Sequence, residues 1–548
     1  MKIQCEFSAR ETREDDGQER RKTWTSRGKT RSQSCSGSMI ARRSWGTSLS
    51  PVVTSSTAAT RRARVAARSR VGISREGAER KSFPSPLQYQ KGGGLMQLSR
   101  WCYFFHHEGI SALVNSLTLG VVYVSTKELH VLLEKLRSQD DVGETELIQL
   151  LVSQGLLVEN QAVDEAACVG IRERLKSEMS LELLYLLVTD GCNLRCTYCF
   201  EETPSVTSPF RSTRMTKETV LRALDLFAAM STRHGNPEKK KVIHLYGGEP
   251  LVNRRAVYEA ISYVSDLKVR GVLAKSCQVA IVTNGVLLCE EDARLFASHN
   301  VTVGLSIDGP ASITDLYRIP KRRDIHVTER IISAFRMLKH CGVSVGLSVT
   351  LTPPAIEHFD EFLAFFTNGE FRTADGISLN LLHFTPNMVL SADYYRAAVK
   401  CQIKAFERFR ELGIYEERVM RKVRAFVDQE VMYADCGVVG RQLVVAPDGR
   451  IGVCQDFVKP RTYFPRSVYD REHGDLLEVL FLGWRDRSPF SMPQCMDCPA
   501  LGICGGGCPA SAELKTGNRF NLDERACHHS KQILEWLVWD AYAKLTSK

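Results

Sequence analysis

Three cysteines stand close together in the stretch Cys192-x3-Cys196-x2-Cys199, so one short loop offers three thiolates to a metal. A closed structural zinc site takes four protein ligands, which leaves this loop one ligand short. A four-iron, four-sulfur cluster held by three thiolates keeps one iron open, and an open iron can bind a substrate or a cofactor. On the spacing alone, a zinc knuckle and three unrelated thiols remain alternatives.

The segments around this loop alternate between strand and helix patterns. The loop directly follows the apolar run 184–189, which is typical of a strand buried on both faces. Five more strand candidates follow, with helical stretches between them: 242–246, 279–283, 301–307, 343–351 and 377–382. This order predicts an α/β fold with parallel strands, in the form of a partial, TIM-like barrel of six strand–helix units. In such barrels the chemistry lies on loops at the carboxyl ends of the strands.

Polar motifs occur where these strands end. In strand order they are Gly247-Gly248-Glu249-Pro250, Thr283-Asn284-Gly285, Ser306-Ile307-Asp308-Gly309-Pro310 and, along the fifth strand, Ser348-Val349-Thr350. Two adjacent glycines let a ligand approach the backbone closely, and a neighbouring carboxylate can accept hydrogen bonds from an ammonium group. Each motif alone could be an ordinary turn. Their order on successive strands after the cysteine loop favours one shared site.

The cysteine run, with the aromatic Tyr198 before its third cysteine, resembles the signature of the radical S-adenosylmethionine (SAM) enzymes. In that family the open iron of a [4Fe–4S] cluster chelates SAM, and an electron from the cluster cleaves SAM to methionine and a 5′-deoxyadenosyl radical. The resemblance implies that the Gly-Gly-Glu-Pro motif binds the methionine amino group, that Ser306 lies near the ribose and carboxylate, and that the segment around Val349 lies near the adenine. The implied metal ligands are Cys192, Cys196 and Cys199, and the implied cofactor-binding residues are Tyr198, Gly247, Gly248, Glu249, Pro250, Asn284, Ser306, Asp308 and Val349.

A second group of seven cysteines occupies the last third of the chain, and its spacing resembles the SPASM extension of radical SAM enzymes that modify peptides or proteins. The resemblance implies two auxiliary [4Fe–4S] clusters. One would be held by Cys495, Cys498, Cys504 and Cys527, and the other by Cys436, Cys454 and Cys508. Because seven thiolates leave the second cluster one cysteine short, we expect an open iron or a ligand other than cysteine there. In isolation, Cys495-x2-Cys498 with Cys504-x3-Cys508 would fit a zinc ribbon equally well.

The composition agrees with reduced thiols that bind metal. The chain has 18 cysteines, no signal peptide pattern and no apolar run long enough to cross a bilayer, so we expect a cytoplasmic protein without disulfides and without a membrane partner. Of its 73 basic and 63 acidic residues, 20 basic and 8 acidic residues lie in the first 95. The positive charge therefore belongs to that segment, and we do not expect the enzyme to bind nucleic acid.

Two segments precede the predicted barrel. Residues 1–95 are rich in Ser, Thr, Gly and Arg and show no hydrophobic periodicity, so we expect a disordered basic extension, with Met96 as the natural start. Residues 96–178 contain three strand candidates at 101–105, 112–115 and 120–124, a helix that starts at Ser125 with Glu128 as a capping box, and a second helix over 144–154 that Gly155 ends. With a wing-like strand at 156–158, this segment resembles the small winged-helix domain that binds leader peptides by strand addition. A cap without a ligand is the alternative.

We therefore predict four regions: the extension 1–95, the winged-helix-like module 96–178, a radical SAM barrel over 179–400 and an auxiliary iron–sulfur domain over 401–548. The predicted function is a radical SAM/SPASM maturase that abstracts hydrogen from a ribosomally made peptide or a protein and installs a thioether or carbon–carbon cross-link. The expected partners are a substrate with a leader and a flavodoxin- or ferredoxin-type electron donor.

Two alternatives to this function remain. One is an anaerobic sulfatase-maturating type that forms formylglycine. Those enzymes carry an aspartate directly after the second SPASM cysteine, whereas here Gln455 intervenes before Asp456, which is a candidate general base. The other alternative is a non-catalytic iron–sulfur electron carrier, which has no use for a Gly-Gly-Glu-Pro motif beside an open cluster.

Overall fold

The computed structural model describes residues 88–91, 94–138, 145–199, 213–322, 324–384, 388 and 390–547. All of them belong to one compact unit, Pro51–Lys548. The predicted extension therefore lies outside the described residues, except for the backbone of 88–91 and 94–95.

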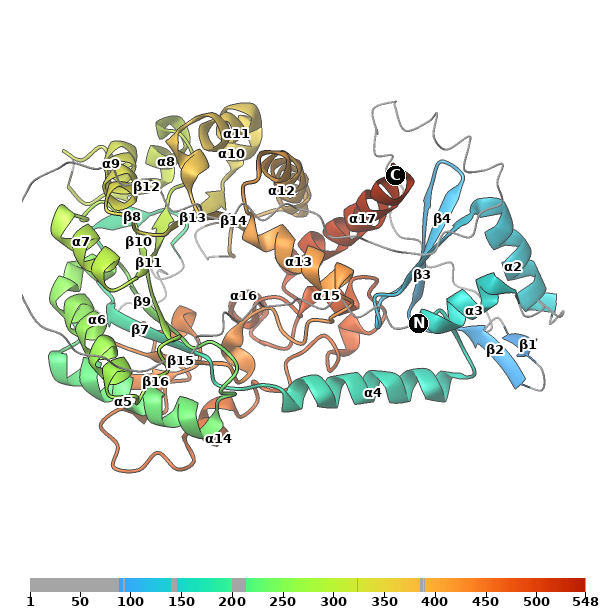
Figure 1. Cartoon of the computed structure of the whole chain (residues 1–548), viewed down its shortest axis with the longest axis horizontal. Coiled ribbons are helices and arrows are strands. Elements are labelled where there is room, and N and C mark those ends of the chain that lie inside the picture. The colour runs from blue at the N-terminus through green and yellow to red at the C-terminus, as the bar shows by residue number, and fades with distance from the viewer. Residues whose placement is uncertain are drawn as a thin grey trace, which may run out of the picture. The chain divides into compact units, whose positions relative to one another are not determined.

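A nine-stranded sheet forms the centre of the fold (Figure 1). Its strands, in spatial order, are β14 (Gly376–Leu381), β13 (Val345–Leu351), β11 (Thr302–Ser306), β10 (Gln278–Thr283), β9 (Val242–Gly247), β7 (Leu183–Thr189), β15 (Gln442–Val445), β16 (Arg450–Gly452) and β17 (Arg466–Ser467). The first seven run parallel to their neighbours, and the last two pair antiparallel. The predicted α/β fold and its six parallel strands are confirmed.

The sheet differs from the prediction at one edge. β15 adds a seventh parallel strand next to β7, although residues 442–445 belong to the region predicted as a separate auxiliary domain. All four of its residues are buried, which is why this short run pairs with the sheet. Among the described strands, β14 and β17 are not paired with each other, so the sheet does not close into a barrel.

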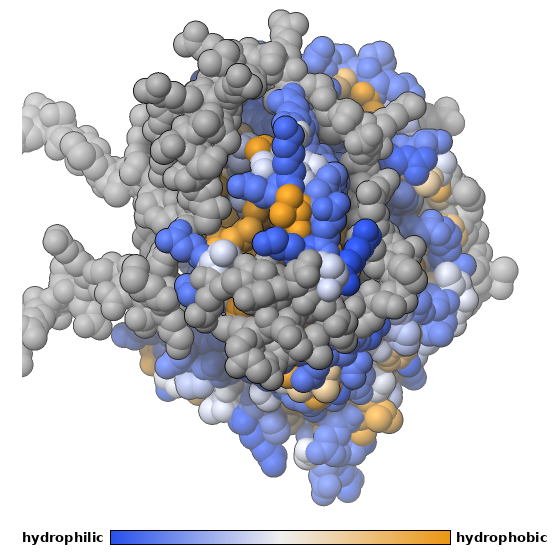
Figure 2. Space-filling model, turned by 90° about the vertical axis from the view of Figure 1, so that its right-hand side faces the viewer, coloured by the Kyte–Doolittle hydropathy of each residue, from blue (hydrophilic) through white to orange (hydrophobic). Residues whose placement is uncertain are grey.

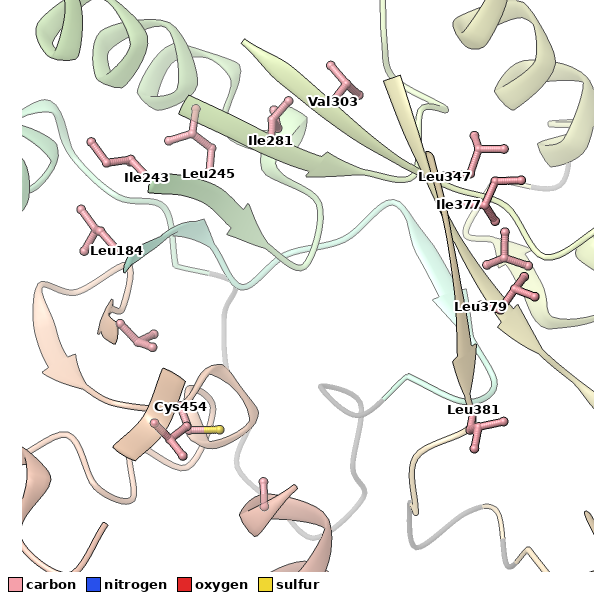
Figure 3. Packing of buried hydrophobic residues seen from close by; sticks show 14 of the residues in the cluster. Leu184, Ile243, Leu245, Ile281, Val303, Leu347, Ile377, Leu379, Leu381 and Cys454 are labelled. Carbon is pink, nitrogen blue, oxygen red and sulfur yellow. The ribbon is translucent and has the colours of Figure 1, made fainter. Parts of the chain in front are cut away.

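Helices cover one face of the sheet because alternate strand residues are apolar. The helices that connect the parallel strands are α5 (Lys217–His234), α6 (Arg254–Val269), α7 (Glu290–Ser298), α8 (Ala311–Tyr317), α9 (Val327–His340), α10 (Pro353–Glu357) and α11 (Phe359–Asn368), and α12 (Ala392–Leu412) follows the last of the six. Figure 3 shows Ile243, Leu245, Ile281 and Val303 on the side of the strands that faces these helices. The core therefore lies between the sheet and the helices, and the opposite face is left for a site.

The segment before the barrel has the predicted strands and helices. β3 (Cys102–His107), β4 (Ile110–Asn115) and β5 (Val121–Ser125) form an antiparallel sheet. α2 (Thr126–Ser138) begins with the predicted capping box, in which the Glu128 N–H donates to Ser125 Oγ at 3.1 Å and the Ser125 N–H donates to Glu128 Oε2 at 2.9 Å. The remaining elements are α3 (Glu146–Ser153), α4 (Gln161–Ser177) and a second sheet of β1 (Gln88–Lys91), β2 (Gly94–Leu98) and β6 (Leu157–Val158). β2 crosses the predicted domain boundary at residue 96.

Both faces of the β3–β4–β5 sheet are covered. One face, with Phe104 and Leu113, packs with α2 and α3 into a small core of its own. The other face, with Tyr103 on β3, joins the main hydrophobic core of the chain, as does Trp101 just before that strand. The segment therefore shares a core with the rest of the protein and does not form a separate body.

Figure 2 shows hydrophilic side chains over most of the coloured surface, interrupted by small apolar patches.

Hydrogen bonds fix this packing to the cysteine-rich end of the chain. Trp101 Nε1 donates to the Met496 carbonyl at 3.1 Å, and the Gly502 N–H donates to the Ser116 carbonyl at 2.8 Å. The Tyr123 hydroxyl donates to the Val538 carbonyl at 2.6 Å. The segment thus supports the loop that carries four of the predicted metal ligands.

That cysteine-rich end consists of mostly short elements joined by loops and closes with one long helix. They are α13 (Glu417–Val427), α14 (Leu476–Phe481), α15 (Leu501–Cys504), α16 (Pro509–Thr516) and the terminal helix α17 (Glu524–Thr546), with 3₁₀ turns at Gly437–Val439, Gln455–Phe457 and Pro493–Cys495. None of the described helices combines the length and the apolar character needed to cross a membrane.

Replacement of Trp101 by Ala should lower the free energy of unfolding by about 3–5 kcal/mol, because it removes a fully buried indole and leaves the Met496 carbonyl without its donor. Urea unfolding of the two proteins measures the difference. The control is Val163→Ala in the same segment, where the side chain is 46% exposed and the change should stay within about 0.5 kcal/mol. Equal unfolding free energies for wild type and Trp101→Ala would contradict the packed arrangement.

Candidate active site

A cavity of about 1330 Å³ lies on the face of the sheet that the helices leave open. Small and polar side chains from alternate strand positions line it: Thr302, Gly304 and Ser306 on β11, Gly346, Ser348 and Thr350 on β13, and Gly376, Ser378 and Asn380 on β14. The intervening positions of β11, Val303 and Leu305, do not line the cavity and are buried in the core. The period of two in the strands therefore separates a polar chamber from an apolar core.

The three cysteines of the predicted cluster loop line one end of this cavity and are half-buried. The loop begins where β7 ends and contains a short strand, β8 (Leu194–Cys196), that pairs antiparallel with β12 (Arg318–Pro320). The Thr197 N–H donates to the Tyr317 carbonyl at 3.0 Å, and the Cys199 N–H donates to the Cys196 carbonyl at 3.1 Å. Backbone pairing with a distant segment thus holds the thiols in place.

A buried ion pair lies beneath this loop. Arg318 donates to both carboxylate oxygens of Asp308, each at 2.9 Å, and both residues are buried. The Tyr198 hydroxyl donates to Asp308 Oδ2 at 2.5 Å, and the Thr350 N–H donates to Oδ1 at 3.0 Å. Asp308 therefore ties the cysteine loop to the ends of β11 and β13.

Burial within this network raises the pKa of the Tyr198 hydroxyl and keeps it protonated. Burial above all, and the Asp308 carboxylate as well, raise the pKa of the Tyr198 hydroxyl far above its ordinary value. Burial by itself would lower the pKa of Arg318, but the Asp308 carboxylate holds it well above its usual range. Sequence reasoning missed Arg318, because a single arginine between two motifs carries no recognisable spacing.

The glycines of the Gly-Gly-Glu-Pro motif are required by the protein itself. Gly247 has φ +142°, and a Cβ there would lie 2.2 Å from the Thr189 carbonyl oxygen. A Cβ on Gly248 would lie 2.6 Å from the Gly191 carbonyl oxygen. Only glycines let the end of β9 approach the start of the cysteine loop this closely. Both glycines also line the cavity, which leaves their predicted contact with a cofactor open.

The Glu249 carboxylate is buried and already accepts three hydrogen bonds. Its donors are the Thr283 hydroxyl at 2.7 Å, the Asn284 N–H at 2.7 Å and the Leu251 N–H at 3.0 Å. Burial raises its pKa to about 7, although these donors act in the opposite direction. Glu249 thus joins the second-strand motif to the third-strand motif. Its predicted contact with an ammonium group stays a prediction.

Of the other residues predicted to bind the cofactor, some line the cavity and others are buried in the protein. Asn284 and Ser306 line the cavity, and Asn284 Nδ2 donates to Asn193 Oδ1 at 2.9 Å within the cysteine loop. Pro250 and Val349 are buried in the protein. The side chain of Val349 points into the core because it alternates with Ser348 and Thr350, so a side-chain contact from this residue is not supported.

The four thiols predicted to share one auxiliary site influence one another. Burial first, and then Cys504, Cys498 and Cys495, raise the pKa of Cys527 to about 12. Burial, followed by Cys504 and Cys498, likewise raises the pKa of Cys495 to about 12. Four thiols that disfavour one another's ionisation fit a site that a cation neutralises.

The three remaining thiols form a second such group. Burial first, and then Asp456, Cys508 and Cys436, raise the pKa of Cys454 well above its ordinary value. One oxygen of Asp456, the Cys508 sulfur and one ring nitrogen of His383 lie within 4.8 Å of one another. Asp456 and His383 both line the cavity that also reaches the first cysteine loop. His383, just after β14, was missed in the sequence, although its place at a strand end is a usable signal.

These donor sets fit the cofactors that the sequence predicts. Three half-buried thiols open onto a polar chamber, as a cluster with one exchangeable iron requires. The chamber also offers backbone groups at Gly247 and Gly248 and the side chains of Asn284 and Ser306 to a polar cofactor.

Comparison with known proteins agrees with this arrangement. Residues 186–366 match the family model of the Radical SAM superfamily. The chain is 23% identical over 389 residues to the radical SAM cyclopropyl synthase TigE of Paramaledivibacter caminithermalis, covering 67% of this chain and 75% of that protein. It is 27% identical over 365 residues to a cysteine-type anaerobic sulfatase-maturating enzyme of Clostridium novyi, covering 65% of this chain and 95% of the relative.

A solved structure shares the fold. The native anSMEcpe protein with bound AdoMet superposes with a TM-score of 0.55 at 18% identity, covering 67% of this chain and 100% of that chain.

Replacement of Asp308 by Ala should lower the free energy of unfolding by about 3–5 kcal/mol, because it leaves the Arg318 guanidinium buried without its partner. Thermal or urea unfolding measures the loss. The exposed pair Arg322–Asp324 supplies the control, since Asp324→Ala should cost at most about 1 kcal/mol. A loss no greater than that of the control would show that the buried pair does not support the loop.

Glu249→Gln should change the pH dependence of stability. With its pKa raised to about 7 in the folded state from 4.5, the carboxyl stabilises the fold below pH 4.5, and this contribution is lost as the pH rises through 7. The unfolding free energy of the wild type, relative to Glu249→Gln, should therefore fall by up to about 3 kcal/mol over this interval. Urea unfolding of both proteins at pH 5 and pH 8 measures it, and a difference independent of pH would refute the assignment.

Proposed function

The chain is a radical SAM enzyme, and we propose that it is a maturase that cross-links a ribosomally made peptide or a protein through a thioether or carbon–carbon bond. Its cofactors are SAM and a [4Fe–4S] cluster. We assign this cluster to Cys192, Cys196 and Cys199, and two auxiliary clusters to the seven cysteines of the last third of the chain.

The single observation that carries the proposal is the extent of the cavity. One chamber of about 1330 Å³ is lined at one end by the cysteine loop and elsewhere by His383 and Asp456, next to the second cysteine group. Typical small-molecule sites occupy about 300–1,000 Å³, so this chamber has room for a segment of polypeptide beside a cofactor. A substrate in it would lie between the radical source and an auxiliary cluster.

When bound, the cluster and SAM supply a 5′-deoxyadenosyl radical that takes one hydrogen atom from a substrate carbon. Bond formation to a thiol or a second carbon then releases a proton and one electron. The substrate thus loses two hydrogen atoms in total. The electron requires an acceptor, and the cysteines near Asp456 would hold one beside the chamber. A flavodoxin- or ferredoxin-type protein would supply the electron for SAM cleavage.

Residues of the chamber wall would orient the substrate. Arg418 lines the cavity, and its Nε donates to Asn380 Oδ1 at 2.8 Å. Among the described residues it forms no ion pair, so its remaining N–H groups are available to a carboxylate or to peptide carbonyls. Ser348 accepts from Asn380 Nδ2 at 3.2 Å and continues this polar wall toward the cofactor end.

We assign leader recognition to the free edges of the β3–β4–β5 sheet. Because both faces of this sheet are covered, a peptide can add only along β3 or β5, each of which has one partner among the described strands. The peptide-bound form of the anSMEcpe protein, with bound AdoMet and the Cp18Cys peptide, supports a peptide as substrate (TM-score 0.53).

A second candidate function is formylglycine formation on a sulfatase-type protein. The coverage of 95% of the Clostridium novyi sulfatase-maturating enzyme favours it. The insertion of Gln455 between Cys454 and Asp456 speaks against it, because the aspartate directly after that cysteine is shifted by one position. The mass of the product distinguishes the two functions. A cross-link removes two hydrogen atoms from the substrate, whereas formylglycine formation replaces the CH₂SH group of a cysteine by an aldehyde.

The test of the proposed function is anaerobic incubation of the reconstituted enzyme with SAM and dithionite. Wild type should contain about twelve irons per chain, and the Cys192, Cys196 and Cys199 triple Ala variant should lose roughly a third of them and all 5′-deoxyadenosine formation. Iron analysis and chromatography provide the readouts, and mass spectrometry of a precursor peptide encoded nearby identifies the product.

The control replaces Cys341 and Cys401, which lie outside all three cysteine groups, and should keep both iron and activity. Stoichiometric zinc without iron, or SAM that is not cleaved, would refute the proposed function.

A further inference from the structure

The second auxiliary site lacks a ligand. A [4Fe–4S] cluster has four irons that each need a protein ligand to be closed, and Cys436, Cys454 and Cys508 supply three. This inference rests on the proposed function, because it presumes that these cysteines hold a cluster. The remaining iron is either open to the substrate or bound by a residue other than cysteine.

Asp456 is the residue next to this incomplete set of cysteines. It follows Cys454 by two residues, in the 3₁₀ turn Gln455–Phe457. One of its carboxylate oxygens lies within 4.8 Å of the Cys508 sulfur. The carboxylate therefore lies near two members of the incomplete set, Cys454 through the turn that they share and Cys508 by distance.

The negative charge of the Asp456 carboxylate also has few partners in the protein. Other carboxylates around the chamber have several donors, such as Glu249 with three and Asp308 with four. No hydrogen bond or ion pair to the Asp456 side chain occurs in the described part of the chain. Arg525 acts on it electrostatically but is paired with Asp523 at 3.1 Å. A half-buried carboxylate among thiols needs a cation, which an iron supplies.

We propose that a carboxylate oxygen of Asp456 is the fourth ligand of the cluster held by Cys436, Cys454 and Cys508. His383 is the competing donor in the same group: its Nδ1 lies 3.3 Å from the Ser511 hydroxyl, and its Nε2 could still bind an iron, so the His383→Ala variant separates the two ligands. Oxygen ligation closes the cluster toward the chamber. Asp456 is then a metal ligand and does not act as the general base that the sequence suggested.

The experiment uses the full chain with Cys192, Cys196 and Cys199 replaced by Ala, so that only auxiliary iron is present. Into this parent we introduce Asp456→Ala, Asp456→Asn, Asp456→Cys and, as the matched control, His383→Ala. Each protein is reconstituted anaerobically, and its iron content and the electron paramagnetic resonance (EPR) spectrum of its reduced clusters are recorded with and without added 2-mercaptoethanol.

Asp456→Ala and Asp456→Asn should create an open iron. Their EPR spectra should change when the thiol is added, and mild oxidation should remove about one of their eight irons, since one iron of one cubane loses its ligand. The parent and His383→Ala should not respond to the thiol. Asp456→Cys should retain all its iron and also not respond, because a thiolate replaces the carboxylate.

Three outcomes would overturn the proposal. They are a parent spectrum that already responds to the thiol, Asp456 variants that behave as the parent does, and a response confined to His383→Ala. A parent without any iron would instead refute the proposed auxiliary clusters themselves. If Asp456→Ala does not fold, the proposal is tested by the near-isosteric Asp456→Asn, which should respond to the thiol, and by Asp456→Cys, which should not.

Discussion

The rest of the site depends on the hydrogen bonds and the ion pair of one fully buried carboxylate, that of Asp308. It receives Arg318 from β12, Tyr198 from the cysteine loop and a backbone N–H from β13, so one side chain connects three segments far apart in the sequence. The loop that carries the thiols has only a three-residue strand of its own, β8, and that strand pairs with the segment that carries Arg318. Without the ion pair, the position of the cluster relative to the chamber would rest on very little backbone pairing.

The sequence predicted those parts of the fold that depend on local pattern. Each of the six parallel strands was found as a short run rich in apolar residues, the first four of them followed by a polar or cysteine motif, and the capping box at Ser125 and Glu128 needs only residues three apart. Contacts set by distant partners were not predictable in this way. The short strand β15, the pairing of Arg318 with Asp308 and the hydrogen bond from Trp101 to the Met496 carbonyl all depend on a partner whose position the local sequence does not encode.

The same distinction holds within the site. Which residues approach the cofactor could be inferred from motifs, but the direction of a side chain follows from strand register, which turns Val349 into the core and Ser348 into the chamber. The motif glycines illustrate a further limit. A ligand and the protein's own backbone can both demand the absence of a Cβ, and at Gly247 and Gly248 the end of β7 and the start of the cysteine loop are enough to demand it.

The chamber wall of serines, threonines and glycines has a consequence for how such a protein can evolve. Residues that pack between the sheet and the helices are interlocked, and changes there disturb their neighbours. The side chains of β11, β13 and β14 that face the chamber touch an open space, so most of them can be exchanged without penalty to the core. Selection can therefore reshape the substrate compartment step by step while the radical source and its supports stay the same. A single scaffold of this kind is free to diversify toward new polypeptides.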